Sequence, residues 1–474
     1  MYKVVLYGLV GLVIIALALS ALGVLSYASF GVLLMMLLLL SVVTFSSNQI
    51  LARLYGVVPN LESSAITALI LFFVLGAPTR TSEWVGIALA GVIAIASKYI
   101  ITWHSAHIFN PAAFGVIAVS LLGVGGGSWW IANAALFIPT LIVGYLILYK
   151  LRRFELFFAF AVPALIVILL TLLPGLPIFE AVITAFTLYP LLFLGTVMLT
   201  EPSTMPTGRY ERIVFGILVG LLFAYTFDLG FIASSPHLAL LVGNLFAFLV
   251  TMRVSAKLKL VEINQLTPTT YSYSFKPEIP FKYKSGQYME FTLPKVQIDS
   301  RGNRRSFSIA SAPADELINI GVKFYQPSSQ FKTALQSLKI GDEIIGNHVA
   351  GEFILQKDTS RSLVFIAGGI GITPFISMIR DMQHTKIIRS IDLYYFVSDK
   401  TEVAYEDILK TASNNGVTVH IRIGRDAQLT NEEIASHPEA DFYLSGPPGL
   451  VNVYKSQLKL NGVKSIHTDY FSGY

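Results

Sequence analysis

The chain has 474 residues, 54% of them hydrophobic and only 13% charged, so it is too long for one domain and too apolar for an ordinary water-soluble protein. It contains no cysteine, which excludes disulfides and iron–sulfur clusters held by cysteine thiolates. Residues 1–255 hold 10 of the 34 basic and 7 of the 29 acidic residues. Charged residues become much more frequent after residue 255. We therefore infer that the first part of the chain lies in lipid and the second part in water. The net charge of +5 is therefore no sign of nucleic-acid binding.

The N-terminal part is predicted to be an all-α membrane bundle. A spanning helix needs about 20 mostly apolar residues, because lipid leaves its backbone no other hydrogen-bond partners. We predict about ten spans, some of them short or broken by Gly and Pro, and we interpret the first as a span rather than a signal peptide. They are residues 3–26, 29–46, 63–78, 82–103, 111–124, 131–150, 154–173, 178–200, 209–229 and 235–254.

The basic residues predict the orientation of this bundle. With the N-terminus inside, nearly all loop Lys and Arg residues fall on the cytoplasmic side, and essentially only Arg80 falls on the other. An even number of spans returns the C-terminal part to the cytoplasm, where reduced nicotinamide nucleotides are available. The sequence thus predicts a multi-pass protein of the cell membrane, in contact with membrane lipid.

Three polar motifs of the bundle suggest a family. Residues 64–69 (SAITAL), 109–112 (FNPA) and 200–209 (TEPSTMPTGR) resemble, in order and spacing, the flavin-carrying membrane subunits B and D of the sodium-pumping NADH:quinone reductase and of Rnf complexes. The resemblance implies a bound flavin near Thr67 and Asn110. Those subunits usually esterify FMN to a Thr, but the corresponding residues 123–130 (GVGGGSWW) lack that motif. A non-covalent FMN or riboflavin is therefore expected.

After residue 256 the pattern changes to short alternating strands and then to strands alternating with helices. Residues 288–293 and 318–324 indicate strands of a β-barrel, while the buried strand 363–367 precedes GGIGITP at 368–374 and a helix. Glycines after a parallel strand let a diphosphate approach the backbone at a helix N-terminus. We predict three domains: a transmembrane electron-transfer domain (1–255), an FAD-binding β-barrel (256–357) and an NAD(P)-binding α/β domain (358–474).

The reductase part resembles the ferredoxin–NADP reductase superfamily through RSFS at 305–308, the glycine-rich loop, SGPPG at 445–449 and the closing DYFSGY at 469–474. By this resemblance, Arg305 binds the FAD pyrophosphate, Phe307 lies against the isoalloxazine ring, and Ser308 hydrogen-bonds near its N5 edge. Phe471, Tyr474 or both cover the other face. Ser445 stands where the family often has Cys, and Ser329 where it usually has Gly. Ser308, Ser445 and Phe471 are the expected catalytic residues.

The other expected cofactor-binding residues of the reductase part fall into two groups. For FAD they are Ser306, Val322, Lys323, Ser329, Lys332 and Thr333. For the nicotinamide nucleotide they are Gly369, Gly371, Thr373, Pro374, Asp399, Gly446 and Pro447. No metal ligands are expected.

Asp399 favours NADH over NADPH, because a carboxylate after the second strand accepts from ribose hydroxyls and repels a 2′-phosphate. The positive charges of Lys400, Arg422 and Arg425 could offset the negative charge of Asp399. The alternative interpretation is that Asp399 is only a solvated turn residue that binds no ribose.

The predicted function is a membrane-bound NADH-dependent flavoprotein oxidoreductase that sends electrons through FAD and a membrane flavin to a quinone or an extracytoplasmic acceptor protein. One alternative is a haem-based ferric reductase or NADPH-oxidase-like enzyme, for which His104, His107 and His237 are the few histidines near the bundle. The other is a redox-regulated transporter, which intramembrane residues such as Lys98, Glu180 and Asp228 would permit.

Overall fold

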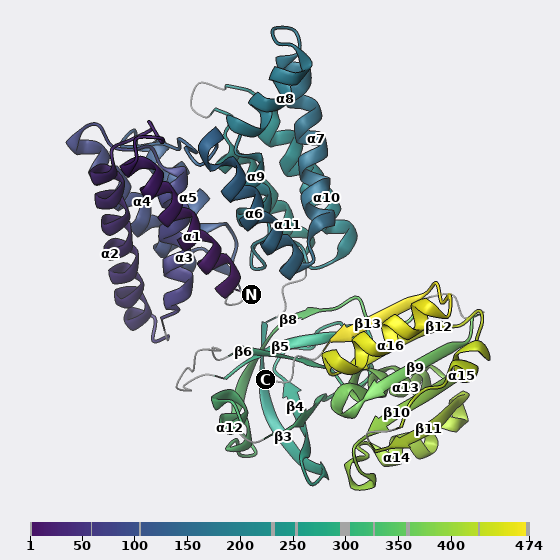
Figure 1. The fold of residues 1–474 in the computed structure, drawn as a ribbon. Coiled ribbons are helices and arrows are strands. Elements are labelled where there is room, and N and C mark those ends of the chain that lie inside the picture. The colour runs from purple at the N-terminus through teal and green to yellow at the C-terminus, as the bar shows by residue number, and fades with distance from the viewer. Residues whose placement is uncertain are drawn as a thin grey trace. The chain divides into compact units, whose positions relative to one another are not determined.

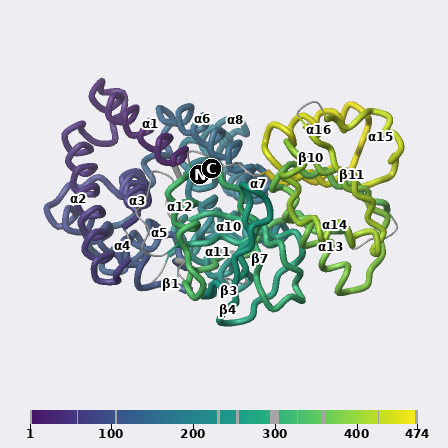
Figure 2. The backbone as a smooth tube through the Cα atoms, turned by 90° about the horizontal axis from the view of Figure 1, so that it is seen from below, coloured from purple at the N-terminus to yellow at the C-terminus, as the bar shows by residue number. Residues whose placement is uncertain are grey.

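In a computed structural model, the chain divides into two compact units, Met1–Met252 and Arg253–Tyr474. The structure describes residues 2–57, 59–103, 106–228, 233–251, 255–293, 304–325, 328–356, 361–424 and 427–470. Figures 1 and 2 show the helical first unit in purple to blue and the second unit in teal to yellow. The boundary expected at residue 357 lies outside the described residues.

Each of the ten segments predicted to span contains a helix. The helices are α1 (Tyr2–Ala21), α2 (Phe30–Leu54), α3 (Leu61–Val74), α4 (Thr81–Ile100), α5 (Pro111–Leu121), α6 (Ala134–Leu151), α7 (Phe154–Leu172), α8 (Ile178–Thr187), α9 (Leu191–Phe193), the π-helix η1 (Leu194–Met198), α10 (Arg209–Ala224) and α11 (Pro236–Val250). A two-residue hairpin, β1 (Thr102–Trp103) and β2 (Ala106–His107), precedes α5.

Among the described residues, five helices are long and apolar enough to cross a membrane: α1, α2, α4, α6 and α7. The predicted span 178–200 is instead bent by 54° between α8 and η1, and counts as a sixth span if the pair is taken as one. The third, fifth and tenth predicted spans are shorter helices, so the ten-span bundle stays a prediction. Met35, Leu38 and Val42 on α2 are more than half exposed, as expected of side chains that face lipid.

Glycines let helices of the first unit approach closely. A Cβ on Gly115 of α5 would lie 2.5 Å from the carbonyl oxygen of Ala90 in α4, and one on Gly220 of α10 would lie 2.3 Å from that of Phe160 in α7. Because lipid tails are as apolar as the side chains, helices in membranes associate through such close backbone packing.

The second unit begins with a six-stranded antiparallel sheet in the order β6-β5-β8-β3-β4-β7. The strands are β3 (Ser255–Thr267), β4 (Thr270–Pro277), β5 (Tyr288–Thr292), β6 (Arg304–Ser308), β7 (Ile318–Lys323) and β8 (Glu343–Ala350), and the helix α12 (Gln330–Gln336) follows β7. A bridge between Ile309 and Ile320 joins the two ends, so the sheet closes into a barrel around its own apolar core.

A five-stranded parallel sheet follows, in the order β11-β10-β9-β12-β13. Its strands are β9 (Leu363–Gly368), β10 (Ile391–Val397), β11 (Val417–Ile423), β12 (Asp441–Gly446) and β13 (Ile466–Tyr470). Its helices are η2 (Gly369–Ile372), α13 (Thr373–Thr385), η3 (Lys400–Glu402), α14 (Glu406–Thr411), η4 (Ala412–Asn415), α15 (Asn431–Ala435) and α16 (Pro448–Leu460). Apolar cores lie on both faces of this sheet, so the central strand β9 is buried throughout.

Candidate flavin and nucleotide site

Strand β6 carries the predicted flavin motif. Its side chains alternate, so that Arg305 and Phe307 are half-buried on one face while Ser306 is exposed on the other. The Phe307 ring lies 5.9 Å from Phe291 and 6.0 Å from Phe331. Phe307 is therefore held as a rigid, partly open aromatic surface, which fits the stacking partner expected for a flavin ring.

Two cations lie next to this surface. The Arg305 guanidinium is 5.4 Å from the Phe331 ring, and the Lys332 ammonium donates to the carbonyl oxygen of Lys323 at 2.7 Å. Burial, and then the positive charge of Arg305, lower the pKa of Lys332 to about 8. The chain thus holds two mutually repelling cations beside an aromatic wall, which suits the pyrophosphate of FAD.

The turn before α12 supports these cations. Ser329 caps the helix by accepting from the backbone N–H of Lys332, and its carbonyl accepts from the Thr333 hydroxyl at 3.2 Å. Val322 is buried in the barrel core, so its side chain does not reach a ligand.

Ser308, at the end of β6, lies close to the end of β13. Burial raises the pKa of the Asp469 carboxyl to about 6, although the nearby Tyr470 backbone and Ser308 side chain lower it in part. Asp469 is also the register partner of Ser445 in β12. The Ser445 hydroxyl is fully buried and has no hydrogen-bond partner among the described residues, as expected of a group that awaits a ligand. The predicted residues Phe471 and Tyr474 lie outside the described residues.

The glycine-rich loop connects β9 to α13. Gly369 has a φ of +53°, which disfavours residues with a side chain. A Cβ on Gly371 would lie 2.4 Å from the carbonyl oxygen of Ser445, so only glycine lets this loop touch β12. Thr373 and Pro374 are buried at the start of α13. The loop therefore lies at the carboxyl ends of the central strands, where nucleotides bind open α/β sheets.

A cavity of about 560 Å³ opens at the same ends of the strands. Of the predicted residues, Lys323, Gly369 and Pro447 line it, and Gly446 comes just before Pro447. Ser398, Glu402 and Tyr454 also line it, and its size suits a small-molecule ligand.

Asp399 lies in the turn that follows β10, outside the lining of the cavity. Its carboxylate accepts from the backbone N–H of Thr401 at 2.8 Å and from the Thr401 hydroxyl at 2.7 Å, and it is not among the residues that line the cavity. Arg422 forms an ion pair with Glu433 and lies over the Tyr394 ring. Arg425 lies outside the described residues.

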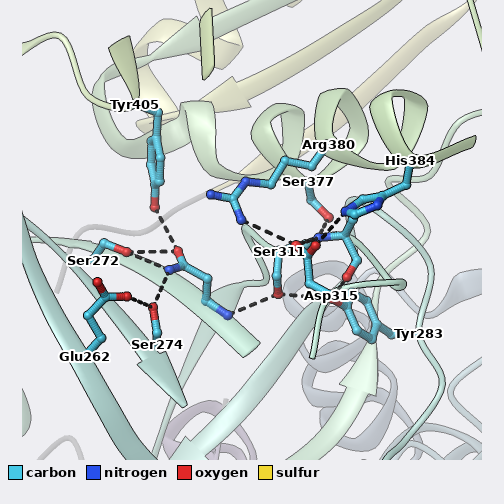
Figure 3. A network of polar contacts seen from close by, with 12 residues as sticks. Glu262, Ser272, Ser274, Tyr283, Ser311, Asp315, Ser377, Arg380, His384 and Tyr405 are labelled. Atoms are coloured by element: carbon cyan, nitrogen blue, oxygen red, sulfur yellow. Dashed lines mark hydrogen bonds and ion pairs between the residues drawn. The ribbon is translucent and has the colours of Figure 1, made fainter. Parts of the chain in front are cut away.

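A buried polar network joins the barrel to the α/β part (Figure 3). The Asn319 amide bonds the Ser272 and Ser274 hydroxyls within the barrel and accepts from the Tyr405 hydroxyl of the α/β part at 3.5 Å. The Ser377 hydroxyl of α13 donates to the carbonyl oxygen of Ser311 at 2.6 Å. These contacts fix the two halves of the reductase unit against each other, and with them the walls of the cavity.

The first unit has its own polar cluster. The predicted residues Thr67 and Asn110 line one cavity together with Lys98 and Glu201. The Lys98 ammonium donates to the Thr67 hydroxyl at 2.7 Å and to the Ser63 hydroxyl at 2.8 Å. Asn110 caps α5 and donates through its amide to Glu201 at 2.7 Å. The cavity holds only about 40 Å³, and these polar groups already bond one another.

The histidines do not form a haem site in the part that the structure describes. His107 bonds Glu201 at 2.9 Å, and His237 accepts from the Trp129 indole at 3.3 Å. His104 lies outside the described residues. No group of three or more His, Asp or Glu residues could hold a metal ion there either.

Three chemically notable residues escaped the sequence-based prediction: Glu402, Asp469 and Glu201 as the partner of Asn110. Glu402 meets Lys323 across 79 positions of the chain, and Glu201 meets Asn110 across 91. No local sequence pattern predicts such pairs. Asp469 and Glu201 are exceptions in part, because Asp469 opens the closing motif already associated with the flavin and Glu201 lies in the motif 200–209.

Residues 365–456 match the family model described as the oxidoreductase NAD-binding domain. These residues form an oxidoreductase NAD-binding domain. The match covers the glycine-rich loop, the Asp399 turn and SGPPG, which are the segments that surround the cavity.

Relatives of known class match the chain over part of its length. It is 27% identical over 223 residues to oxidoreductase NAD-binding domain-containing protein 1 of Pongo abelii, covering 40% of this chain and 69% of that protein. It is 31% identical over 146 residues to methane monooxygenase component C of Methylosinus trichosporium, covering 31% and 41%. It is 27% identical over 228 residues to the propane 2-monooxygenase reductase component of Rhodococcus jostii, covering 43% and 60%. The last two matches span less than two thirds of the relative.

Two solved structures are also similar to the chain. The flavohem-like FAD/NAD-binding domain of nitric oxide dioxygenase from Vibrio cholerae has a TM-score of 0.40 at 20% identity, covering 46% of this chain and 98% of that one. A ferredoxin NADP+ reductase from Neisseria gonorrhoeae has a TM-score of 0.40 at 18% identity, covering 46% and 99%.

The matched part of the second unit is thus that of an NAD(P)H-dependent flavin oxidoreductase.

Proposed function

We propose that this oxidoreductase takes hydride from NADH onto FAD in its second unit and passes the electrons through its first unit, within the cell membrane, to a quinone or an extracytoplasmic acceptor. One observation carries the proposal: a single chain joins an oxidoreductase NAD-binding domain to a unit with five helices long and apolar enough to cross a membrane. Relatives named as reductase components support transfer to a further acceptor. The positive residues of the loops favour a cytoplasmic reductase unit.

In this proposal, different residues of the second unit contact different parts of FAD and of the nucleotide. Arg305 and Lys332 bind the FAD pyrophosphate, and Phe307 lies against the ring. Bound FAD supplies the conversion of a hydride into single electrons. Ser308 ends β6 and Asp469 lies in β13, and Asp469 can hold a proton up to about pH 6 because burial raises its pKa to about 6. Ser445 offers its hydroxyl to the nicotinamide end of the nucleotide.

A second flavin near Thr67 and Asn110 does not fit the structure as it stands. The polar groups around the cavity already bond one another, so an isoalloxazine ring would have to break the contacts of Lys98 with Thr67 and of Asn110 with Glu201. We therefore derive no electron-transfer step through a flavin there. Direct reduction of a quinone by the reduced FAD of the second unit is the simpler form of the proposal.

The test uses membranes that contain the full chain. NADH should bleach the flavin absorbance, and added quinone should restore it; a flavin that NADH does not bleach would refute the first step. Residues 1–255, purified alone, decide on the second flavin: a colourless, folded unit leaves only FAD, whereas a flavin released by acid reinstates the membrane flavin. A Soret band in the full chain would instead establish the haem-based alternative.

A further inference from the structure

The nucleotide cavity contains one ion pair that connects the two halves of the reductase unit. The Lys323 ammonium, at the end of β7 in the barrel, lies 2.8 Å from the Glu402 carboxylate in η3 of the α/β part. Both side chains are only about one-seventh exposed, at 14% and 13%. Partial burial removes much of the water that would otherwise screen the charges.

Further contacts hold Glu402 in this position. Its carboxylate accepts from the Thr269 hydroxyl at 2.8 Å and from the Thr267 hydroxyl at 3.4 Å, both at the turn between β3 and β4. Three residues along, the Tyr405 side chain reaches the barrel, where its hydroxyl donates to the Asn319 amide oxygen at 3.5 Å. Glu402 is therefore fixed on the cavity wall and cannot simply swing into solvent when a ligand enters.

Lys323 and Glu402 are the only charged side chains among the described residues that line this cavity. Together they leave its wall with no net charge. A dinucleotide brings two negative charges on its pyrophosphate, and NADPH brings about two more on its 2′-phosphate. A cavity wall with no net charge offers no positive charge to balance the additional negative charge of the 2′-phosphate.

We propose that Glu402 is a specificity-determining residue: by neutralising Lys323, it keeps the cavity selective for NADH over NADPH. This inference rests on the proposed binding of a nicotinamide nucleotide in the cavity. It is independent of the role predicted for Asp399, which does not line the cavity and accepts from Thr401 through one carboxylate oxygen. The net charge of the Lys323–Glu402 pair then sets the preference between NADH and NADPH. Mutation can make this net charge positive or negative.

The test compares four forms of the full-length protein by the rate at which NADH and NADPH bleach the bound flavin. Glu402→Gln leaves the wall with one positive charge, and Lys323→Met leaves it with one negative charge. The double variant is neutral again, like the wild type. We expect the NADH-to-NADPH ratio of kcat/KM to fall about tenfold in Glu402→Gln, to rise about tenfold in Lys323→Met, and to return close to the wild-type value in the double variant.

A purely structural role for the pair predicts a different result. Breaking a clamp between the two halves would slow both nucleotides equally, and the ratio would stay constant in all four forms. Glu402→Asp keeps the charge and should keep the ratio. Glu406→Gln and Lys410→Met alter an exposed pair 3.1 Å apart on the neighbouring α14, and should also leave it unchanged.

Flavin content and melting temperature, measured for every variant, separate misfolding from altered preference. A constant ratio across folded variants, or a wild type that uses NADPH as well as NADH, would overturn the inference. Wild-type flavin that NADH does not bleach would refute the proposed function itself, so the two failures are distinguishable.

Discussion

At the scale of single residues, the proposed flavin site contains two cations that repel each other, and a bound anion would relieve this repulsion. Arg305 and Lys332 share one corner of the barrel, and the pKa of Lys332 is lowered to about 8. A binding site organised in this way gains affinity because the ligand relieves a repulsion that is already present. Two predictions follow from the two cations.

Arg305→Ala should weaken FAD binding by about 1.5–3 kcal/mol, roughly 10- to 150-fold in Kd, because a charge-assisted contact to phosphate is lost. Arg304→Ala is the matched control: Arg304 is next in the strand but half-exposed, and it pairs with Glu290 at 3.3 Å. Fluorescence titration of the deflavinated variants measures both. Equal losses in the two variants would contradict the assignment of Arg305.

The affinity for FAD should fall as the pH rises above about 8. In the free protein Lys332 loses its proton near that pH, while the FAD pyrophosphate raises the pKa of Lys332 and so favours the protonated form. Binding above pH 8 therefore takes up a proton, and Kd should increase by at most about tenfold per pH unit. Lys332→Met should bind more weakly and lose this dependence. An unchanged pH profile in Lys332→Met would show that Lys332 does not contact the phosphates.

Asp469 should make the fold less stable at neutral than at acidic pH. Its folded pKa of about 6 lies above the usual value of 3.8, so the folded state binds more protons, and stability falls as the pH rises from about 4 to 6. Asp469→Asn removes this cost and should stabilise the protein at pH 7.5 by on the order of 1–3 kcal/mol, with little difference near pH 4. Melting curves at the two pH values measure the effect. A variant less stable at both would contradict the prediction.

At the scale of elements, the sequence predicts where helices and strands lie better than where they end. The apolar runs locate every helix of the first unit, but α5 ends at Leu121 because Gly123, at a φ of +70°, reverses the chain. Pro190 similarly separates α8 from α9 within one predicted span. In the second unit, the alternating strands and the glycine-rich loop predict a barrel followed by an α/β sheet, as the structure has them.

Contacts between distant elements are harder to predict. The flavin roles of Arg305, Phe307 and Ser308 rest on one short motif of a single strand, and they stay predictions. The partners Lys323 and Glu402 come from different halves of the reductase unit, and neither lies in a motif that specifies the other. The ribose contact of Asp399 stays a prediction: its position after β10 suggested it, and in the structure one oxygen of its carboxylate accepts from the Thr401 hydroxyl two residues away.

The packing of the glycine-rich loop against β12 gives a prediction at this scale. Gly371→Ala would place a Cβ 2.4 Å from a backbone oxygen, which cannot move without shifting β12, so we expect a loss of about 1–3 kcal/mol in stability and weaker NADH binding. Gly449→Ala, at the start of α16, meets nothing within 4 Å and is the control for stability alone, because Gly449 lines the nucleotide cavity. Chemical unfolding of the two variants provides the comparison, and equal stability would disprove the close contact.

At the scale of the whole molecule, the chain combines two units with opposite solvent preferences. The first exposes apolar side chains along α2, while the second buries its apolar side chains in three cores. Under the proposed function, each unit folds in its own environment and electrons pass from the second unit toward the first. The chain should then tolerate a cut between the units far better than a cut within either one.

A cut at residue 255 tests this division. Residues 256–474 should be recovered from the soluble fraction with FAD, and should reduce a soluble artificial acceptor with NADH, because every residue of the proposed flavin and nucleotide sites lies within them. Residues 1–255 should remain in membranes after an alkaline wash, which removes proteins held only by surface charge, since apolar helices stay in lipid. Their release by the wash would contradict a membrane-spanning first unit. A soluble, flavin-free second unit would instead show that the FAD site needs the first unit to form.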